Sequence, residues 1–206
     1  MEILASSLNP QQTYKLMTGI VVPRPIAWIT TLSDEGVVNL APFSCFTFVS
    51  NKPPMVGINI GRKAGVRKDT GHNIHANKEF VVHVADENLL EPMHLSAIEH
   101  PSDVSEAELL GLQTRQSDCV RVPRLSAAPV SMECVLRQII PFGDTGAEFY
   151  VGEVLVFHVR DELYENGKID TGKLKPVCRL GGPNYSKLGE IVHMAPLAQT
   201  EKTVIR

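Results

Sequence analysis

Long apolar runs are missing from the sequence. No stretch approaches the roughly 20 consecutive apolar residues that a membrane span needs, so we expect no membrane partner. The N-terminal segment contains Glu2 and has no basic stretch ahead of an apolar one, which is not the pattern of a secretory signal. We therefore expect a cytoplasmic protein.

Cysteines are few and scattered. The chain of 206 residues has four, Cys45, Cys119, Cys134 and Cys178, and no two of them form a CxxC pair. Without an export signal, the expectation is reduced thiols in a reducing compartment. A structural zinc site needs clustered ligands, which the sequence does not show, so we predict no metal site.

An excess of charge of one sign is also absent. The chain has 20 Lys and Arg residues against 23 Asp and Glu residues, a formal net charge of −3, which argues against a protein that coats nucleic acid. The GxGxxG, GxxxxGKS/T and GxSxG motifs of common nucleotide and hydrolase sites are missing as well. His72 and His75 lie near each other in the chain, but no third ligand accompanies them, so a shared metal ion is not expected.

What the chain does contain is typical of one folded, strand-rich domain. It is 43% hydrophobic and 21% charged, which is ordinary for a globular protein and too apolar for a disordered one. Its 14 prolines and 15 glycines favour a fold of strands and loops over a helical bundle. No internal repeat or low-complexity tract divides it, so we treat residues 1–206 as a single domain.

Apolar and β-branched runs separated by turn residues predict strands. They lie at 26–32, 37–40, 44–49, 55–60, 80–85, 130–140, 149–159 and 191–194. Helical spacing predicts short helices over 70–78, 88–97 and 105–110. A doubly wound parallel sheet would need a helix after nearly every strand, which is not the pattern here. The sequence therefore favours a mainly β fold, a closed or partly closed antiparallel β-barrel with a few helices.

A cluster of basic residues precedes one predicted helix. Four cations lie within residues 62–68 of a chain whose net charge is negative, in a loop that leads to the helix start near Thr70. The free N–H groups of a helix N-terminus bind anions, and Lys68 and Thr70 could add a point charge and a hydroxyl donor for a phosphate. The alternative is that Asp69 or Thr70 only caps the helix while the basic side chains are solvated.

A second segment, residues 39–46, has a proline inside a predicted strand. Pro42 interrupts the run, and a strand break of this kind leaves backbone N–H groups that can bind the polar edge of a ring. The alternative is an edge strand whose aromatic side chains fill the core. Trp28, the only tryptophan, is by itself more typical of a core residue than of a stacking platform.

Short motifs in a fixed order resemble those of a known family. They are RPIAWITT at 24–31, NLAPFS at 39–44, SNKPP at 50–54, KDT at 68–70 with Asn73, EFVV at 79–82, GEV at 152–154, LKPV at 174–177 and RLGG at 179–182 with Tyr185. Each motif is weak alone, but their order over about residues 20–190 resembles the flavin reductase-like family of FMN-binding split barrels. The similarity is to the branch with flavoredoxin and the reductase components of two-component monooxygenases.

The resemblance implies a particular fold and assembly. The fold is a split barrel whose core spans about residues 20–190, followed by a C-terminal tail. The assembly is a homodimer that binds FMN at the subunit junction. The near-continuous apolar run 151–159, apart from His158, also favours a homodimer, because a barrel of this size has little interior to absorb such runs.

The resemblance also assigns roles to individual residues. Contacts to the flavin ring and ribityl chain are implied for Asn39, Ala41, Pro42, Ser44, Cys45 and Phe46, through the Ser44 hydroxyl and the N–H groups near Cys45 and Phe46. A phosphate clamp is implied for Lys68, Asp69, Thr70 and Asn73. Cofactor binding is also implied for Trp28 and Thr30, on a strand alongside the cofactor, and for Arg179 and Tyr185, which either touch flavin or shape the barrel.

The implied function is NAD(P)H-dependent reduction of FMN. Hydride transfer from NADH or NADPH to the flavin needs positioning and no protein acid or base, so no catalytic side chain is assigned. The reduced flavin would pass electrons to a monooxygenase or another acceptor partner. A Gly-Arg-His segment linked to nicotinamide use in another branch is absent, and His158 is not part of such a motif, so the electron donor stays open.

Two alternatives remain. A flavin electron-transfer module similar to flavoredoxin would never meet a nicotinamide. A vitamin B6 phosphate oxidase shares the general barrel, but its phosphate-binding arginine and serine motifs do not appear in the sequence. Oxidation of NAD(P)H in the presence of FMN separates a flavin reductase from an electron-transfer module.

Overall fold

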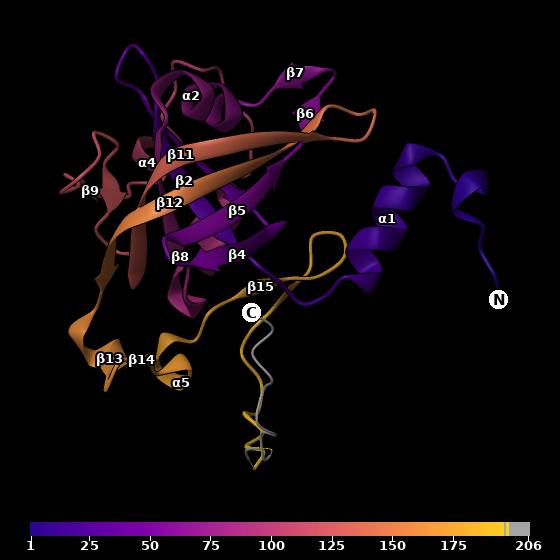
Figure 1. Cartoon of the computed structure of the whole chain (residues 1–206). Helices are drawn as coiled ribbons and strands as arrows, with labels where there is room; N and C mark the ends of the chain where they lie inside the picture. Colours follow the sequence, from indigo (N-terminus) through magenta and orange to yellow (C-terminus); the bar gives the residue numbers. More distant parts are fainter. Residues whose placement is uncertain (196, 198–206) are drawn as a thin grey trace, which may run out of the picture.

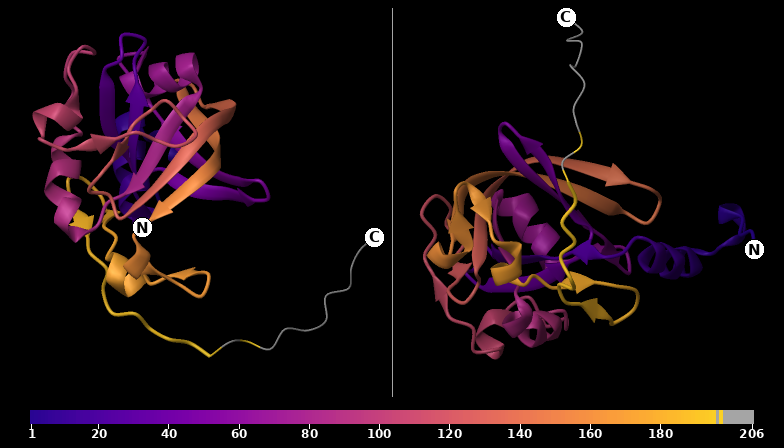
Figure 2. Two further views of the ribbon diagram at one scale, coloured as in Figure 1. Left: turned by 90° about the vertical axis from the view of Figure 1, so that its left-hand side faces the viewer. Right: turned by 90° about the horizontal axis from the view of Figure 1, so that it is seen from below.

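The computed structural model describes residues 1–195 and 197, and its centre is a curled antiparallel sheet of seven strands (Figure 1). In spatial order these are β3 (Val38–Phe43), β2 (Ala27–Leu32), β8 (Glu79–Val84), β11 (Val130–Phe142), β12 (Ala147–Val159), β5 (Pro54–Ile60) and β4 (Phe46–Asn51). The consecutive strands β3 and β4 form the two edges, so the barrel is split between them (Figure 2). The mainly β fold and the seven strands predicted between residues 26 and 159 are confirmed.

Shorter elements surround this barrel. The strands are β1 (Arg24–Pro25) with β15 (Cys178–Arg179) and β16 (Tyr185–Ser186), β6 (Arg62–Lys63) with β7 (Val66–Arg67), β9 (Thr114–Arg115) with β10 (Arg124–Leu125), and β13 (Tyr164–Glu165) with β14 (Lys168–Ile169). The helices are α1 (Pro10–Ile20), α2 (Asp69–Asn77), α3 (Leu90–Leu95), α4 (Glu106–Leu109) and α5 (Thr171–Leu174), with 3-10 turns at Ala5–Ser7, Glu87–Leu89 and Asp161–Leu163. In the described part of the chain, no helix has the length and apolar character needed to cross a membrane.

The helices and one strand depart from the sequence-based predictions. The three predicted helices are present as α2, α3 and α4, with α3 shorter than its predicted range. The strand expected at 191–194 is not formed, because a strand needs a neighbour for its backbone N–H and C=O groups and none of the described strands pairs with this segment. Helix α1 is not among the predicted helices, although Asn9 and Gln12 form a capping box at its start.

Alternate residues of β2 face two separate cores. Ala27 and Ile29 point into the barrel, where they belong to the same cluster as Phe80. Trp28, between them, packs on the outside with residues of α3. The barrel interior is tight, since a Cβ added to Gly152 would lie 2.3 Å from the Cζ atom of Phe80. The two-residue period of a strand thus gives β2 a barrel face and an outer face.

Helix α1 projects from the barrel and buries none of its residues (Figure 1). Its apolar side chains Tyr14, Met17 and Ile20 are 70%, 54% and 66% exposed. An amphipathic helix normally buries such side chains against the rest of the protein. The helix therefore presents an uncovered apolar surface, which in folded proteins marks an interaction site.

A buried ion cluster attaches the β6–β7 hairpin to the barrel. Glu148 of β12, whose side chain is 9% exposed, accepts two bonds from Arg67, from Nη2 at 2.8 Å and from Nε at 2.9 Å. Arg62 Nη2 lies 3.4 Å from the same carboxylate, and the Tyr150 hydroxyl donates to it at 2.9 Å. The hydrogen-bonded Arg67 guanidinium lowers the pKa of Glu148 to about 2. The carboxylate thus fixes the hairpin that carries Lys63.

Replacing this carboxylate should destabilise the protein in a pH-dependent way. Glu148→Gln should lower the free energy of unfolding by about 2–3 kcal/mol near neutral pH, because it leaves Arg67 without its charged partner. The folded-state pKa of Glu148 is depressed, so its stabilisation is complete above the unfolded value of about 4.3 and is lost as the pH falls toward about 2. Urea titrations should therefore show a difference between wild type and variant that shrinks below about pH 4.

The matched control is Glu153→Gln on the same strand. Its partner Arg137 is 53% exposed, so this pair contributes little and the variant should unfold nearly as the wild type does. If the loss in free energy of unfolding caused by Glu148→Gln stayed constant across the acid range, the assigned ion cluster would be contradicted.

Candidate functional site

Three adjoining hollows form one groove along the side of the barrel. The first, of about 260 Å³, lies at the N-terminus of α2 and shares Pro42, Lys68 and Ala97 with the second, of about 410 Å³. The second shares Arg24 and Ser44 with the third, of about 470 Å³, which adjoins aromatic side chains of β4, β11 and β12. We name these hollows, in that order, the cationic end, the middle and the aromatic end of the groove.

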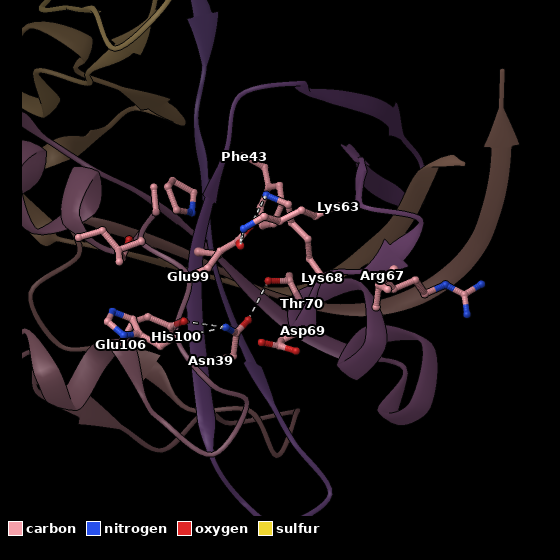
Figure 3. A pocket seen from close by; sticks show the side chains of 16 residues that line it. Asn39, Phe43, Lys63, Arg67, Lys68, Asp69, Thr70, Glu99, His100 and Glu106 are labelled. Atoms are coloured by element: carbon pink, nitrogen blue, oxygen red, sulfur yellow. Dashed lines mark hydrogen bonds and ion pairs between the residues drawn. The ribbon is translucent and has the colours of Figure 1, made fainter. Parts of the chain in front are cut away.

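The cationic end combines two lysines with the start of a helix (Figure 3). Lys68 is the N-cap residue of α2, and its side chain makes no capping hydrogen bond. Lys63 pairs with one oxygen of Glu99, and Lys68 Nζ lies 3.9 Å from the other. Burial, and then the neighbouring Lys63, lower the pKa of Lys68. Two ammonium groups thus share one carboxylate, and an anion that displaced Glu99 would gain both of them together with the first-turn N–H groups of α2.

A buried polar network lies under the cationic end (Figure 3). The Thr70 hydroxyl donates to Asn39 Oδ1 at 2.7 Å, and Asn39 Nδ2 donates to the Glu106 carboxylate at 3.2 and 3.3 Å. Glu106 also accepts from the N–H of Leu40 at 2.9 Å. Thr70 is 1% exposed, and its single hydroxyl proton is used in this network. In this arrangement Thr70 therefore neither caps α2 nor has a proton free for an anion.

Asn73, expected in the phosphate clamp, lies behind this network. Its Nδ2 donates to the Thr31 hydroxyl at 3.0 Å, and Thr31 donates to Asn39 Oδ1 at 3.3 Å. Asn73 is buried and does not line the groove, so it holds α2 against β2 without reaching a ligand there. Asp69, by contrast, lies at the groove in the first turn of α2.

Arg24 organises the middle of the groove. It is buried, and its Nη1 donates to the carbonyls of Thr18 and Val21, each at 2.7 Å. Its Nη2 donates to the carbonyl of Leu180 at 3.0 Å, and its Nε lies 3.3 Å from Ser44 Oγ. One side chain thus joins the end of α1, the loop after β15 and the break between β3 and β4.

Arg179 and Tyr185 line the middle of the groove as a stacked pair. The guanidinium carbon of Arg179 lies 4.6 Å from the ring centroid of Tyr185, and Nη1 donates to the Tyr185 hydroxyl at 2.5 Å. His94 Nδ1 is 2.9 Å from the same hydroxyl. Because β15 and β16 also pair these two residues, they both face the groove and shape the small sheet beside it.

The aromatic end lies at the break between β3 and β4. Cys45, Phe46 and Phe149 line it, and the N–H of Asn59 donates to the Cys45 carbonyl at 2.8 Å. The Oδ1 atom of Asn59 is buried and has no hydrogen-bond partner among the described residues. A buried acceptor without a donor is costly, so a ligand N–H would satisfy it. Neither Asn59 nor Arg24 is predicted as a binding residue from the sequence. For Asn59 the one sequence signal is a polar residue within an apolar strand.

Trp28 and Thr30 lie away from the groove, contrary to expectation. Both are fully buried; Trp28 Nε1 donates to Ser96 Oγ and the Thr30 hydroxyl donates to the Pro123 carbonyl, each at 2.8 Å. They occupy the outer face of β2, because successive residues of a strand point to opposite faces. Neither side chain can therefore contact a cofactor in the groove.

The groove brings together most of the residues expected at the site. They are Asn39, Ala41, Pro42, Ser44, Cys45, Phe46, Lys68, Asp69, Thr70, Arg179 and Tyr185. The lining changes from cationic through polar to aromatic along the groove. A ligand with an anionic group, a polar chain and a planar ring with an N–H edge fits this order, which is the chemistry of FMN. The two lysines on Glu99 and the unpartnered Asn59 acceptor are the observations that support this fit.

The chain resembles known flavin-associated proteins in sequence and in structure. Residues 17–173 match the family described as "Flavin reductase like domain". The crystal structure of nitrilotriacetate monooxygenase component B from Bacillus cereus is 40% identical and has a TM-score of 0.92, over 94% of this chain and 98% of that one. The 2-nitrobenzoate 2-nitroreductase of Pseudomonas fluorescens is 36% identical and has a TM-score of 0.87, over 95% of each chain.

A more distant structure agrees on the fold. A split-barrel protein of Shewanella frigidimarina has a TM-score of 0.83 at 20% identity, over 96% of this chain and 100% of that one. The split barrel expected from the resemblance is thus confirmed. Since the family match covers well over half of the sequence and the fold agrees over nearly all of it, the chain belongs to the flavin reductase-like family.

Proposed function

We propose that this protein binds FMN in the groove, takes electrons from NADH or NADPH, and supplies reduced flavin to an acceptor. The observation that carries the proposal is the order of the groove lining, which matches the phosphate, ribityl chain and ring of FMN. The family supports a flavin-dependent oxidoreductase. The similarity to a monooxygenase component B supports a monooxygenase as the acceptor.

The FMN phosphate would be held at the cationic end. Lys63 and Lys68 would bind it as Glu99 is displaced, and such charge-assisted hydrogen bonds are stronger than neutral ones. The N–H groups of the first turn of α2 add further donors. Thr70 and Asn73 act from behind, because their buried hydrogen bonds keep α2 in place.

The flavin ring would be held at the strand break. Cys45 and Phe46 line this part of the groove, where their backbone N–H groups would bind the ring edge. Asn59 Oδ1 would accept a hydrogen bond from a ring N–H. When bound, FMN accepts a hydride and carries the reaction. The guanidinium group of Arg24, which lines both the middle and the aromatic end, would stabilise negative charge that develops on the ring, so no protein acid or base is assigned.

Removing the Lys68 ammonium should weaken the binding of FMN but not that of riboflavin. Lys68→Ala should weaken FMN binding about tenfold to a hundredfold and leave riboflavin binding nearly unchanged, because riboflavin has no phosphate. The defect should shrink at high salt, which already screens the wild-type contact. Thr70→Val should instead affect both flavins alike, because its hydroxyl bonds to Asn39. Fluorescence titrations with FMN and riboflavin measure these affinities.

Lys168→Ala in the β13–β14 hairpin is the control, since it removes the same charge away from the groove. It should bind both flavins as the wild type does. Equal losses of FMN and riboflavin affinity in Lys68→Ala would mean that the phosphate lies elsewhere on the chain.

Anaerobic addition of NADH and of NADPH to the FMN-loaded protein tests the proposed activity. The visible absorbance of the flavin should disappear with at least one of the two, because hydride transfer needs only the correct placement of the nicotinamide. Comparing the two rates identifies the donor. A protein that is bleached by dithionite but by neither nicotinamide would overturn the reductase and favour the electron-transfer module.

Reduction of a nitroaromatic acid by the same bound flavin is a second candidate function. The similarity to 2-nitrobenzoate 2-nitroreductase, at 36% identity over 95% of each chain, favours it. After anaerobic bleaching, 2-nitrobenzoate should restore the flavin absorbance if the protein has this activity. A spectrum that stays bleached until oxygen enters would exclude 2-nitrobenzoate as the acceptor.

We also propose a homodimer in which α1 packs against a second copy of the chain. The exposed apolar residues Met17 and Ile20 of α1 support this assembly, as do Leu155 and Phe157 on β12, which are 41% and 56% exposed. Sedimentation at micromolar concentration should give twice the chain mass of 22.6 kDa. The double variant Met17→Glu, Ile20→Glu should shift the protein toward the monomer. A wild-type mass of 22.6 kDa would contradict the dimer.

A further inference from the structure

Arg124 is buried, and its side chain has an unsatisfied donor. The residue lies in β10 and is 8% exposed. Its Nε atom is buried and has no hydrogen-bond partner within residues 1–195 and 197. A guanidinium is always charged and has five N–H donors, so leaving it unpaired in the interior is costly. An acceptor from outside the chain is therefore expected.

The side chain lines a hollow of about 350 Å³, which we name the arginine pocket. The polar residues that line it are Arg115, Arg124, Ser126, Ser131, His158 and Arg160. Strand pairing assembles them, because β9 places Arg115 opposite Arg124 and β11 places Ser131 opposite His158 of β12. The arginine pocket shares no lining residue with the groove, and β9 and α1 lie on opposite sides of the barrel (Figure 1).

The acidic side chains nearby already have other partners. Glu133 is fully buried and accepts from the N–H groups of Asp118 at 2.7 Å and Cys119 at 2.6 Å. Its Oε1 also lies 2.6 Å from His158 Nε2. The Asp118 side chain is 66% exposed and lies 3.9 Å from the same nitrogen. Both carboxylates lie near enough to act on the charge of Arg124, but neither forms a direct ion pair with it.

Three arginines line the arginine pocket. Among the described residues, Arg160 is the one of the three that forms an ion pair, with Nη1 at 3.8 Å from Asp86. Arg115 and Arg124 have no ion-pair partner in the part of the chain that the structure describes. Two guanidinium groups on adjacent strands thus have no carboxylate bonded to them in this part of the chain.

A cation is not the ligand that this geometry favours. Asp118, Glu133 and His158 have ligand atoms within 4.8 Å of one another, which is a possible metal arrangement. The Glu133 oxygens, however, already accept hydrogen bonds from two backbone N–H groups, and one of them also contacts His158 Nε2. The unpaired charge on Arg124 next to them would also repel a metal ion.

We propose that the arginine pocket binds a phosphate dianion, either as inorganic phosphate or as the phosphate group of a small ester. Two unpaired guanidiniums match two negative charges, and their planar forks bind phosphate oxygens bidentately. The hydroxyls of Ser126 and Ser131 provide donors for the remaining oxygens. The volume is about ten times that of one water molecule, of roughly 30 Å³, so an organic group attached to the phosphate also fits.

Thermal unfolding of the protein as purified tests the proposal with inorganic phosphate as the probe. Phosphate should raise the melting temperature of the wild type by about 3 °C or more above potassium chloride of the same ionic strength, because a ligand that binds only the folded state stabilises it. Arg124→Met should lose this phosphate-dependent rise. In chloride it should melt no lower than the wild type, since the substitution removes an unpaired buried charge.

Two control variants separate this site from other basic groups. Arg121→Met removes an arginine close in sequence that is paired with Glu79 and lies outside the pocket, so its response to phosphate should equal that of the wild type. Lys68→Ala removes the lysine of the groove and should keep the part of the response that Arg124→Met loses. A response that survives in Arg124→Met and vanishes in Lys68→Ala would overturn the proposal and assign phosphate to the groove.

A second variant keeps the test valid if Arg124→Met does not fold. Arg115 is exposed, so Arg115→Gln is compatible with folding and should weaken phosphate binding about tenfold in a phosphorus NMR titration. Glycerol 3-phosphate as a second probe distinguishes the two sources of phosphate: tighter binding than inorganic phosphate indicates an ester ligand, and weaker binding indicates the free ion. No saturable binding of either probe to the wild type would overturn the proposal.

Discussion

The architecture around the groove depends on the hydrogen bonds of one buried amide, that of Asn39. Its oxygen accepts from Thr70 of α2 and Thr31 of β2, and its nitrogen donates to Glu106 of α4. Both ends of the amide are therefore used, and they connect the β2–β3 hairpin with α2 and α4, which are distant in sequence. A buried network whose members are all satisfied is rigid, because breaking any one bond leaves an unpaired polar group. The start of α2 is thereby held at a constant position relative to the strand break.

The ion pairs around the groove differ in strength according to their exposure. Glu148 has a 9% exposed side chain and a bidentate arginine, so it holds the β6–β7 hairpin firmly. Glu99 has a 45% exposed side chain, and such a pair is weak in water. The same hairpin therefore presents Lys63 at a defined place while leaving its counter-ion exchangeable. A groove built in this way can accept an anion at little cost in stability.

The arginine pocket differs from the groove in how its positive charge is paired. In the groove a carboxylate of the chain is paired with the lysines, whereas Arg124 is enclosed without one. A charge that has been desolvated but not paired raises the free energy of the folded state, and a bound anion would remove that cost. Both regions are thus basic, but the groove already holds a carboxylate beside its lysines and the arginine pocket has none bonded to Arg124. The two regions share no lining residue.

Much of the fold can be predicted from local sequence. Apolar alternation and turn residues place the seven barrel strands within a few residues of their observed positions, because both signals depend on neighbours in the chain. The segment at 191–194 shows the limit of such signals, since a β-prone run forms a strand only where another strand is free to pair with it. Helix α1 is the opposite case: it has a local capping box and forms although none of its residues is buried.

The candidate site, like the fold, can be predicted from the sequence only in part. By itself, the sequence determined the basic loop, the proline-containing segment 39–46 and the ordered motifs, and these identify the family and most of the groove lining. The break expected at Pro42 is wrong, because edge strand β3 continues through Pro42 to Phe43 and ends only before Ser44. Only the tertiary structure decided which polar side chains face a ligand. Trp28 and Thr30 point away from the groove. Thr70 and Asn73 donate their hydrogen bonds to other buried side chains. Asn59 keeps an acceptor without a partner among the described residues. The physical reason is that a polar side chain binds its nearest available partner, and for these residues that partner is supplied by strands and helices distant in sequence.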